Sequence, residues 1–187
     1  MCGRYVAVAD RSKIERQFEA RPIDGEALAP DFNVAPTKKV YAVMDRHDER
    51  ELKIVRWGLI PSWAKDPKIG SRMINARLES ASSKPSFRAA WKKRRALIPA
   101  DGYYEWYAPE VGPDSPAKPA KQPYYIHPRD GSLMSMAGLY EIWRDPTVAD
   151  DDDPLAFRWT CTILTTDAID DLGRIPARMP LLVAPAT

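Results

Sequence analysis

Apolar runs bounded by turn residues predict that this chain is built mainly of short strands. Runs rich in β-branched and aromatic residues are typical of strands, whereas charged, Pro-rich and Gly-rich stretches are typical of turns. The predicted strands cover residues 3–8, 39–44, 52–57, 96–107, 124–126, 134–140 and 157–164. Residues 30–37, bracketed by prolines, predict an ordered loop or a bent strand.

One amphipathic helix is predicted near the start of the chain, over residues 10–18. Ile14 and Phe18 are four positions apart and therefore lie on one face of a helix. Asp10 or Ser12 is expected to be the N-cap, because both side chains accept hydrogen bonds from free backbone amides. We expect this helix to pack against the sheet.

A second short helix and two surface loops complete the predicted elements. Residues 86–94 predict a helix with Phe87 and Trp91 on its inner face. Residues 108–122 are rich in Pro, Ala and Lys, and residues 145–154 contain four consecutive acids. Each of these segments separates strand-like runs, so both are expected to be hairpin tips within one domain.

Composition agrees with a single globular domain over residues 1–187. The chain is 44% hydrophobic and 29% charged, and it shows no apparent membrane span or signal peptide. Cys2 and Cys161 are too few for a disulfide framework or a standard metal site, so no metal and no cofactor are expected. Cys161 lies in an apolar strand and is expected to be buried. A reducing cytoplasm is the expected location.

Charge is distributed unevenly along the chain. Residues 61–95 contain ten basic and two acidic residues and are net +8, whereas the whole chain is +2, which leaves −6 for the remainder. A localised basic surface attracts a phosphate backbone. For residues 92–95 alone, a solvated helix face is an equally good interpretation.

Two tryptophans lie beside this basic segment, in a predicted loop over residues 57–63. Aromatic side chains interleaved with cations are typical of single-strand binders, because bases stack on the rings while cations meet the phosphates. Trp57 is expected to be in the core. Trp63 is equally well explained as a base contact or as an ordinary surface residue.

Cys2 directly follows the initiator methionine, and its chemistry is distinctive. Removal of Met1, which a small second residue favours, leaves a 1,2-aminothiol: a free α-amine and a thiol on one residue. Such a pair condenses with an aldehyde, first to an imine and then to a thiazolidine ring. Position alone also allows an unremarkable residue in a frayed terminus, but the strand predicted over residues 3–8 favours an ordered start.

Three further polar residues are candidates for a site. Asn75 and Arg77 are two apart on an extended segment over residues 73–79, so they point to one face and could bind a phosphate or a sugar oxygen. Glu105 lies in an aromatic strand, where burial would raise its pKa toward values suited to proton transfer. The alternative for Glu105 is a salt-bridged or solvent-facing residue.

Several sequence blocks together resemble the SRAP (SOS response-associated peptidase) family, whose members shield abasic sites in single-stranded DNA. The blocks run in the family order along essentially the whole chain. They are residues 1–5, 33–36, 56–63, 75–79, 99–106 and 178–180. The resemblance implies an α+β fold with a β-barrel-like mixed or antiparallel sheet and short flanking helices.

The resemblance also implies a function and a set of site residues. The mature Cys2 would capture the ring-opened abasic aldehyde as a thiazolidine DNA-protein crosslink. Asn75 and Glu105 join Cys2 as implied catalytic residues, Glu105 as an acid or base. The implied DNA contacts are Arg4, Asn33, Pro36, Trp63, Arg77, Phe87 and Arg178. The implied partner is single-stranded DNA with abasic sites, bound by a monomer without a metal, with association with the nucleoid while it is bound. The peptidase activity in the family name would refer to removal of Met1.

The sequence departs from the family pattern in two places. The family normally has a histidine in the block that corresponds to residues 175–180, where this chain has Pro176. That histidine is associated with imine chemistry and crosslink reversal, so we expect this protein to capture abasic DNA and to release it poorly. Family members also continue beyond this block, so a C-terminal truncation, as a fragment or a shortened variant, is expected.

Two other functions remain open at this point. One is a degenerate module that binds single-stranded DNA through the basic, aromatic surface without the full chemistry. The other is an N-terminal-nucleophile hydrolase that acts on an amide, which would also use a residue freed by processing. Salt dependence separates the DNA-binding functions from the hydrolase, because phosphate contacts weaken as salt rises.

Overall fold

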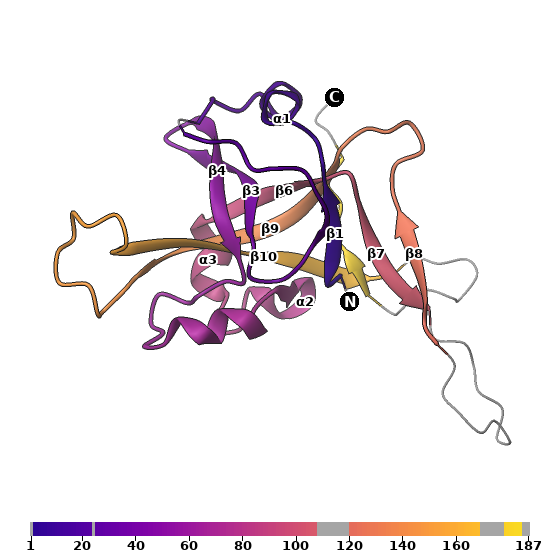
Figure 1. The fold of residues 1–187 in the computed structure, drawn as a ribbon. Helices are drawn as coiled ribbons and strands as arrows, with labels where there is room; N and C mark the ends of the chain where they lie inside the picture. Colours follow the sequence, from indigo (N-terminus) through magenta and orange to yellow (C-terminus); the bar gives the residue numbers. More distant parts are fainter. Residues whose placement is uncertain (1, 24, 108–119, 169–177, 185–187) are drawn as a thin grey trace, which may run out of the picture.

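Five strands close into a small barrel at the centre of the computed structural model, which describes residues 2–23, 25–107, 120–168 and 178–184 (Figure 1). The barrel strands are β3 (Lys39–Arg46), β4 (Glu49–Trp57), β6 (Arg95–Ala100), β9 (Met134–Arg144) and β10 (Phe157–Asp167). They pair in the order β10, β4, β3, β6, β9, and β9 pairs again with β10. The β10–β4 pair is parallel and the others are antiparallel.

Two short strands extend the barrel along β10. The strand β5 (Asn75–Arg77) pairs with it in parallel, and β11 (Arg178–Pro180) pairs with it antiparallel. The α+β class and the barrel-like mixed sheet expected from the resemblance are therefore confirmed.

A second sheet of four antiparallel strands lies against the barrel (Figure 1). Its order is β2 (Asp31–Val34), β1 (Arg4–Ala7), β7 (Gly102–Tyr107) and β8 (Gln122–Ile126). Tyr5 and Tyr103 from this sheet share one buried cluster with Trp57, Ile98 and Ile163 of the barrel. Burying a large apolar side chain contributes about 1.5–3 kcal/mol, so this shared core holds the two sheets together.

Trp57 occupies the centre of that core, as predicted. Its side chain is fully buried, its ring packs edge-on against Tyr5 at a centroid distance of 5.3 Å, and its Nε1 donates to the carbonyl oxygen of Ile74 over 2.8 Å. A buried indole N–H needs such an acceptor. The bond ties β4 to the segment that leads into β5.

The prediction of one continuous strand over residues 96–107 is wrong, because the chain bends at Asp101. The first half is β6 of the barrel and the second half is β7 of the four-stranded sheet. The Asp101 carboxylate accepts hydrogen bonds from the backbone amides of Val8 and Ala9, over 2.7 and 3.1 Å. These long-range bonds fix the corner, and a local apolar pattern gives no indication of them.

The helix near the start of the chain is confirmed as α1 (Arg11–Phe18). Asp10 is its N-cap, with the carboxylate accepting from the Lys13 amide over 2.8 Å. Ile14 and Phe18 are buried against β3 and its neighbours, in a cluster with Tyr41. The residue pattern therefore predicted both the helix and its buried face.

The basic segment forms three short helices, the 3₁₀ helix η1 (Pro67–Arg72), α2 (Leu78–Ala81) and α3 (Arg88–Lys93). Extended structure predicted for residues 73–79 ends at Arg77, because Leu78 begins α2. Phe87, which caps α3, is buried and Trp91 is half-buried, as predicted for the inner face. Among the described residues, no helix is both long and apolar enough to cross a membrane.

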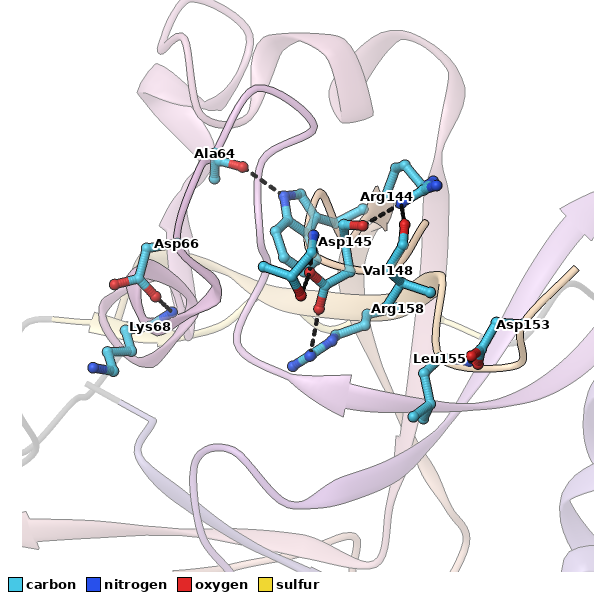
Figure 2. A network of polar contacts seen from close by, with 11 residues as sticks. Ala64, Asp66, Lys68, Arg144, Asp145, Val148, Asp153, Leu155 and Arg158 are labelled. Atoms are coloured by element: carbon cyan, nitrogen blue, oxygen red, sulfur yellow. Dashed lines mark hydrogen bonds and ion pairs between the residues drawn. The ribbon is translucent and has the colours of Figure 1, made fainter. Parts of the chain in front are cut away.

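The acidic segment over residues 145–154 forms the tip of the β9–β10 hairpin, as predicted (Figure 2). The Arg144 guanidinium donates to the carbonyl oxygens of Asp145 and Val148. The Asp145 carboxylate accepts from Thr147 and, over 2.6 Å, from Arg158. These bonds, with Thr147 as the largest cause, hold the pKa of Asp145 below its usual value.

The same hairpin anchors the start of the basic segment. The fully buried Trp143 donates from Nε1 to the carbonyl oxygen of Ala64 over 2.7 Å (Figure 2). Trp63, the residue before Ala64, is thereby fixed to the barrel through its backbone. The hairpin that flanks residues 108–122 is confirmed by the β7–β8 pair, whereas residues 108–119 and Pro176 lie outside the described residues.

Candidate functional site

Cys2 lies at the junction of the two sheets, directly before β1. Its side chain is fully buried in the cluster that contains Tyr5, Trp57 and Tyr103. Burial, and then the negative charge of Glu105, raise the pKa of the Cys2 thiol to about 12. Cys2 is therefore held within the fold rather than frayed, and its thiol stays protonated at neutral pH.

Asn75 reaches across from the barrel to the start of the chain. Its Nδ2 donates to the backbone carbonyl oxygen of Cys2 over 2.7 Å. Asn75 is held in place because β5 pairs with β10, with Asn75 opposite Ile163. Its Oδ1 is buried and accepts no hydrogen bond from the described residues. A buried acceptor of this kind is a ready partner for a donor on a substrate.

Glu105 lies on the face of β7 that points toward Cys2, and its side chain is buried, with 2% exposed. Burial raises the pKa of its carboxyl. Tyr103, two residues earlier on the same face, also has a raised pKa of about 12, because of burial and then the negative charges of Cys2 and Glu105. The sequence reasoning missed Tyr103, although the two-residue period of the strand that contains Glu105 could have indicated it.

Arg4 and Asn33 are brought together at the rim of the site. The Arg4 Nη1 donates to the Asn33 Oδ1 over 3.2 Å, across the β1–β2 pair. Pro36 lies half-buried in the connection between β2 and β3. Among the described residues no carboxylate is within ion-pair distance of Arg4, so its charge is available to an anion.

Trp63 and Arg77 present exposed side chains on the basic segment. The Trp63 side chain is 57% exposed, and its Nε1 donates to the carbonyl oxygen of Pro85 over 3.3 Å. Trp63 also lines an open cavity of about 430 Å³ together with Lys65, Lys68 and Arg72. The Arg77 side chain makes no hydrogen bond or ion pair within the described part of the chain, although its backbone belongs to β5.

Phe87 and Arg178 have structural contacts in the described conformation. Phe87 is 5% exposed and packs in a cluster with Leu59 and Leu139. The Arg178 guanidinium forms ion pairs with Glu79 and Asp167, over 3.0 and 2.9 Å, and it also donates to the Thr165 carbonyl oxygen. Their predicted contacts with DNA stay predictions.

The site therefore unites a buried thiol, an amide and a carboxyl from three distant parts of the sequence. Cys2, Asn75 and Glu105 meet where the barrel and the four-stranded sheet join. Across the described ranges, no group of three or more His, Cys, Asp or Glu side chains is arranged to hold a metal ion. The chemistry that these residues can supply is nucleophilic attack with proton transfer.

Known protein families and known proteins include clear matches to this chain. The profile of the SOS response associated peptidase (SRAP) family matches residues 1–187. The chain is 39% identical to the abasic site processing protein YoqW of Bacillus subtilis, over 98% of this chain and 76% of that protein. It is 30% identical to the abasic site processing protein HMCES of Gallus gallus, over 98% of this chain and 62% of that protein.

The fold is also shared with solved structures. A crystal structure of a protein from Bacteroides thetaiotaomicron superposes with a TM-score of 0.81 and 26% identity, over 98% of this chain and 77% of that one. A protein from Bordetella bronchiseptica superposes with a TM-score of 0.72 and 26% identity, over 98% of this chain and 84% of that one. The family profile, the relatives and the shared fold lead to one conclusion: the chain belongs to the SRAP family.

Proposed function

We propose that this protein processes abasic sites in single-stranded DNA, by covalent capture of the ring-opened sugar on the mature Cys2. The observation that carries the proposal is the meeting of Cys2, Asn75 and Glu105 in one buried junction. The names of the relatives YoqW and HMCES, both abasic site processing proteins, support the substrate.

Hydrolysis of the Met1–Cys2 peptide bond is the first step. Until then the Cys2 nitrogen belongs to an amide and is not a nucleophile. Water supplies a hydroxyl to the methionine carboxyl group and a hydrogen to the nitrogen, which becomes a free α-amine. Such an amine titrates near about 8, so a useful fraction is unprotonated at neutral pH.

The pKa of Cys2 sets the order of the next steps. In the chain that retains Met1, burial raises the pKa of the Cys2 thiol to about 12; the same burial favours a protonated thiol after Met1 is removed, so the amine attacks the aldehyde carbon first. The carbinolamine then loses water to give an imine. The sulfur adds to the imine carbon and its proton passes to the nitrogen, which closes a thiazolidine. Aldehyde and aminothiol thus combine with the release of one water.

Glu105 is the group suited to these proton transfers. Protonated, it can donate to the hydroxyl that leaves the carbinolamine, and ionised, it can accept the thiol proton. Both the protonated and the ionised carboxyl of Glu105 are needed within one cycle. The raised pKa of this buried carboxyl brings the pH at which both forms are populated closer to the working pH. Asn75 holds the Cys2 carbonyl, which orients the amine and the thiol beside Glu105.

The exposed cations support binding of a nucleic-acid strand. Residues 61–95 contain ten basic residues. Among the described residues, Arg94 forms an ion pair with Glu141, and the other nine form none. The others can meet phosphates without first breaking an internal pair. Trp63 supplies an exposed ring beside them for a base.

Intact mass spectrometry after incubation with an abasic oligonucleotide tests the proposal. The parent protein should lose Met1 and gain the mass of the DNA minus one water. Cys2→Ser keeps the amine without the thiol, so it should give an adduct only when borohydride reduces the imine. Cys161→Ala, which alters the other buried thiol, should react like the parent.

Two outcomes would contradict the proposed chemistry. An adduct of Cys2→Ser that is stable without borohydride would show that the thiol is not required. A parent protein that lacks Met1 and binds the same DNA without forming an adduct would instead identify a binding module without crosslinking activity.

A further inference from the structure

The outer face of the four-stranded sheet carries a row of aromatic rings that the proposed chemistry does not use. The Tyr104 and Tyr125 rings have a centroid distance of 5.3 Å and an interplanar angle of 40°. The Tyr125 ring also stacks on the imidazole of His127, with a centroid distance of 4.8 Å and an interplanar angle of 19°. Trp106 adds a fourth ring, 6.3 Å from Tyr104. The Tyr125–His127 pair is stacked and the two pairs of Tyr104 are tilted, so the rings form an aromatic platform whose members are inclined to one another.

The two faces of β7 have different roles. Side chains alternate along a strand, so Tyr103 and Glu105 point toward Cys2 while Tyr104 and Trp106 point away. Tyr125 lies directly over Gly102 on the outer face, because a Cβ at Gly102 would come within 2.5 Å of the Tyr125 Cε2. The glycine therefore lets the Tyr125 ring lie against the backbone.

The platform is open to solvent. The Tyr125 side chain is 43% exposed, and Phe32 on the neighbouring edge strand is 69% exposed. The Tyr104 hydroxyl donates to the backbone carbonyl oxygen of Phe32 over 3.2 Å, so the backbone of Phe32 lies beside the Tyr104 side chain. We call Phe32, Tyr104, Trp106, Tyr125 and His127 the aromatic face. Exposed aromatic residues that gather in this way indicate an interaction surface.

Arg4 makes the aromatic face continuous with the reactive site. It follows Cys2 by two residues, and it is the direct cross-strand partner of Tyr104 in the β1–β7 pair. The charge of Arg4 has no ion-pair partner among the described residues. A strand of DNA captured at Cys2 can therefore place its next phosphate on Arg4 and its next bases over Tyr104.

We propose that the aromatic face is a stacking platform for bases of the single strand on one side of the captured abasic site. The proposal rests on the proposed function, because it extends the path of the same DNA. Trp63 and the basic segment would receive the strand on the other side. The site would then lie between two binding arms, one mainly electrostatic and one mainly aromatic.

Charge favours DNA over a second copy of this chain as the occupant. Lys121 and Arg129, both exposed, flank β8, and Arg4 adds a third cation beside Tyr104, whereas Asp130 follows Arg129 and Asp31, before Phe32, is paired with Lys38. A two-fold interface would bring each patch against its own copy, which would oppose like charges. A polyanion with stackable bases meets both the rings and the cations.

The test compares binding of undamaged single-stranded DNA with crosslinking to abasic DNA. Fluorescence anisotropy should show that Phe32→Ala and Tyr125→Ala each weaken binding of a 20-nucleotide oligothymidine by about tenfold, as expected when one stacked base is lost. Tyr125→Phe keeps the ring and should bind like the parent. Phe157→Ala, which removes an exposed ring at the β9–β10 tip, is the matched control.

Position is tested by photocrosslinking with 5-iodo-deoxyuridine placed one to four nucleotides to either side of the abasic site. Peptides that contain Phe32 or Tyr125 should be labelled from one side only. Labelling from neither side, or unchanged binding by both alanine variants, would overturn the proposal. A shift of oligomeric state in Tyr125→Ala, measured by sedimentation, would also overturn it in favour of a protein interface.

Failure of the proposed function gives a different result. If the parent protein forms no Cys2 adduct, the proposed chemistry is wrong, yet the anisotropy series with undamaged DNA still decides whether the aromatic face binds bases. If the adduct forms normally in the parent and in both alanine variants at saturating DNA, and binding of the oligothymidine weakens, the aromatic face is supported.

Discussion

Asn75 and Cys2, which are 73 residues apart in the sequence, are joined by one hydrogen bond of 2.7 Å from the side-chain amide to the backbone carbonyl. This bond connects β5, at the edge of the barrel, to the residue that precedes β1. The backbone of Cys2, the proposed nucleophile, is thus fixed from outside its own strand. Positioning of this kind is needed wherever two groups of one residue must both reach a single carbon.

Asn75→Ala should therefore impair capture more than it impairs folding. Removing the donor leaves a buried carbonyl unsatisfied, which costs about 1–3 kcal/mol of unfolding free energy, and we expect adduct formation to slow by about tenfold or more. The readouts are the adduct rate by mass spectrometry and the urea midpoint. The matched control is Gln17→Ala, which removes a side-chain donor to the Leu133 carbonyl far from Cys2 in sequence. A rate equal to the parent rate would rule out the positioning role.

Glu105→Gln should slow capture and also change how stability depends on pH. The folded-state pKa of Glu105 is raised above its ordinary value of 4.5, so between those values the folded protein binds more protons than the unfolded chain. Stability of the parent therefore falls as pH rises through that window. Glu105→Gln should show a smaller fall, measured by urea unfolding at several pH values from 4 to 8.

The buried Glu141 provides a contrast for this prediction. Its carboxylate forms an ion pair of 2.9 Å with Arg94, so Glu141→Gln breaks a buried pair and should destabilise the protein at neutral pH, which gives a reference for the pH profile of Glu105→Gln. Equal pH profiles for the parent and Glu105→Gln would contradict the raised pKa of Glu105.

Neither Cys2 nor Cys161 should react with thiol reagents in the folded protein. Cys2 and Cys161 are fully buried, and burial raises the pKa of both thiols, that of Cys2 to about 12. Ellman's reagent at pH 8 should detect no thiol in native protein and two per chain in denaturant. Cys161→Ala isolates Cys2. Rapid reaction of Cys2 before unfolding would show that it is more accessible than the structure indicates.

The raised pKa values of the two thiols also predict how the stability of the protein changes at alkaline pH. Because their folded-state pKa values are raised above 9.0, the folded protein retains protons that the unfolded chain releases, and stability falls as pH rises above about 9. Cys161→Ala should reduce that loss without affecting adduct formation at neutral pH.

Salt dependence of DNA binding should identify the phosphate contacts. Arg77→Gln removes an exposed cation that has no partner in the described part of the chain, so the slope of log K against log salt should become shallower by about 0.7. Arg46→Gln is the matched control, because Arg46 is paired with Glu51. An unchanged slope for Arg77→Gln would exclude Arg77 as a phosphate ligand.

The elements that depend on local pattern could be predicted from the sequence. The spacing of Ile14 and Phe18 indicated α1 and its buried face, and Asp10 supplied its cap. The strands β3 and β4 were recognisable as β-branched runs around a charged turn, where His47 and Asp48 adopt positive φ angles. Periodicity and capping depend on a few neighbouring residues and can therefore be recognised in a single sequence.

Features that depend on distant partners could not be predicted in this way. The bend at Asp101 exists because its carboxylate binds amides more than 90 residues earlier. Nothing in an apolar run that continues through Tyr103 marks that bend. For the site, residue chemistry indicated Cys2 and Glu105, and the family resemblance was required to add Asn75 as a catalytic residue. The aromatic face became visible only with the register of β1, β7 and β8.

The position of β1 between two partner strands has a mechanical consequence. Under the proposed crosslink, a DNA strand that is pulled would transmit its tension to Cys2 and thus to one end of β1. Since β1 pairs with β2 on one side and β7 on the other, a pull along the strand axis loads both ladders in shear, with several backbone bonds sharing the force instead of opening one after another. The proposed attachment point would therefore resist a pulling force on the DNA.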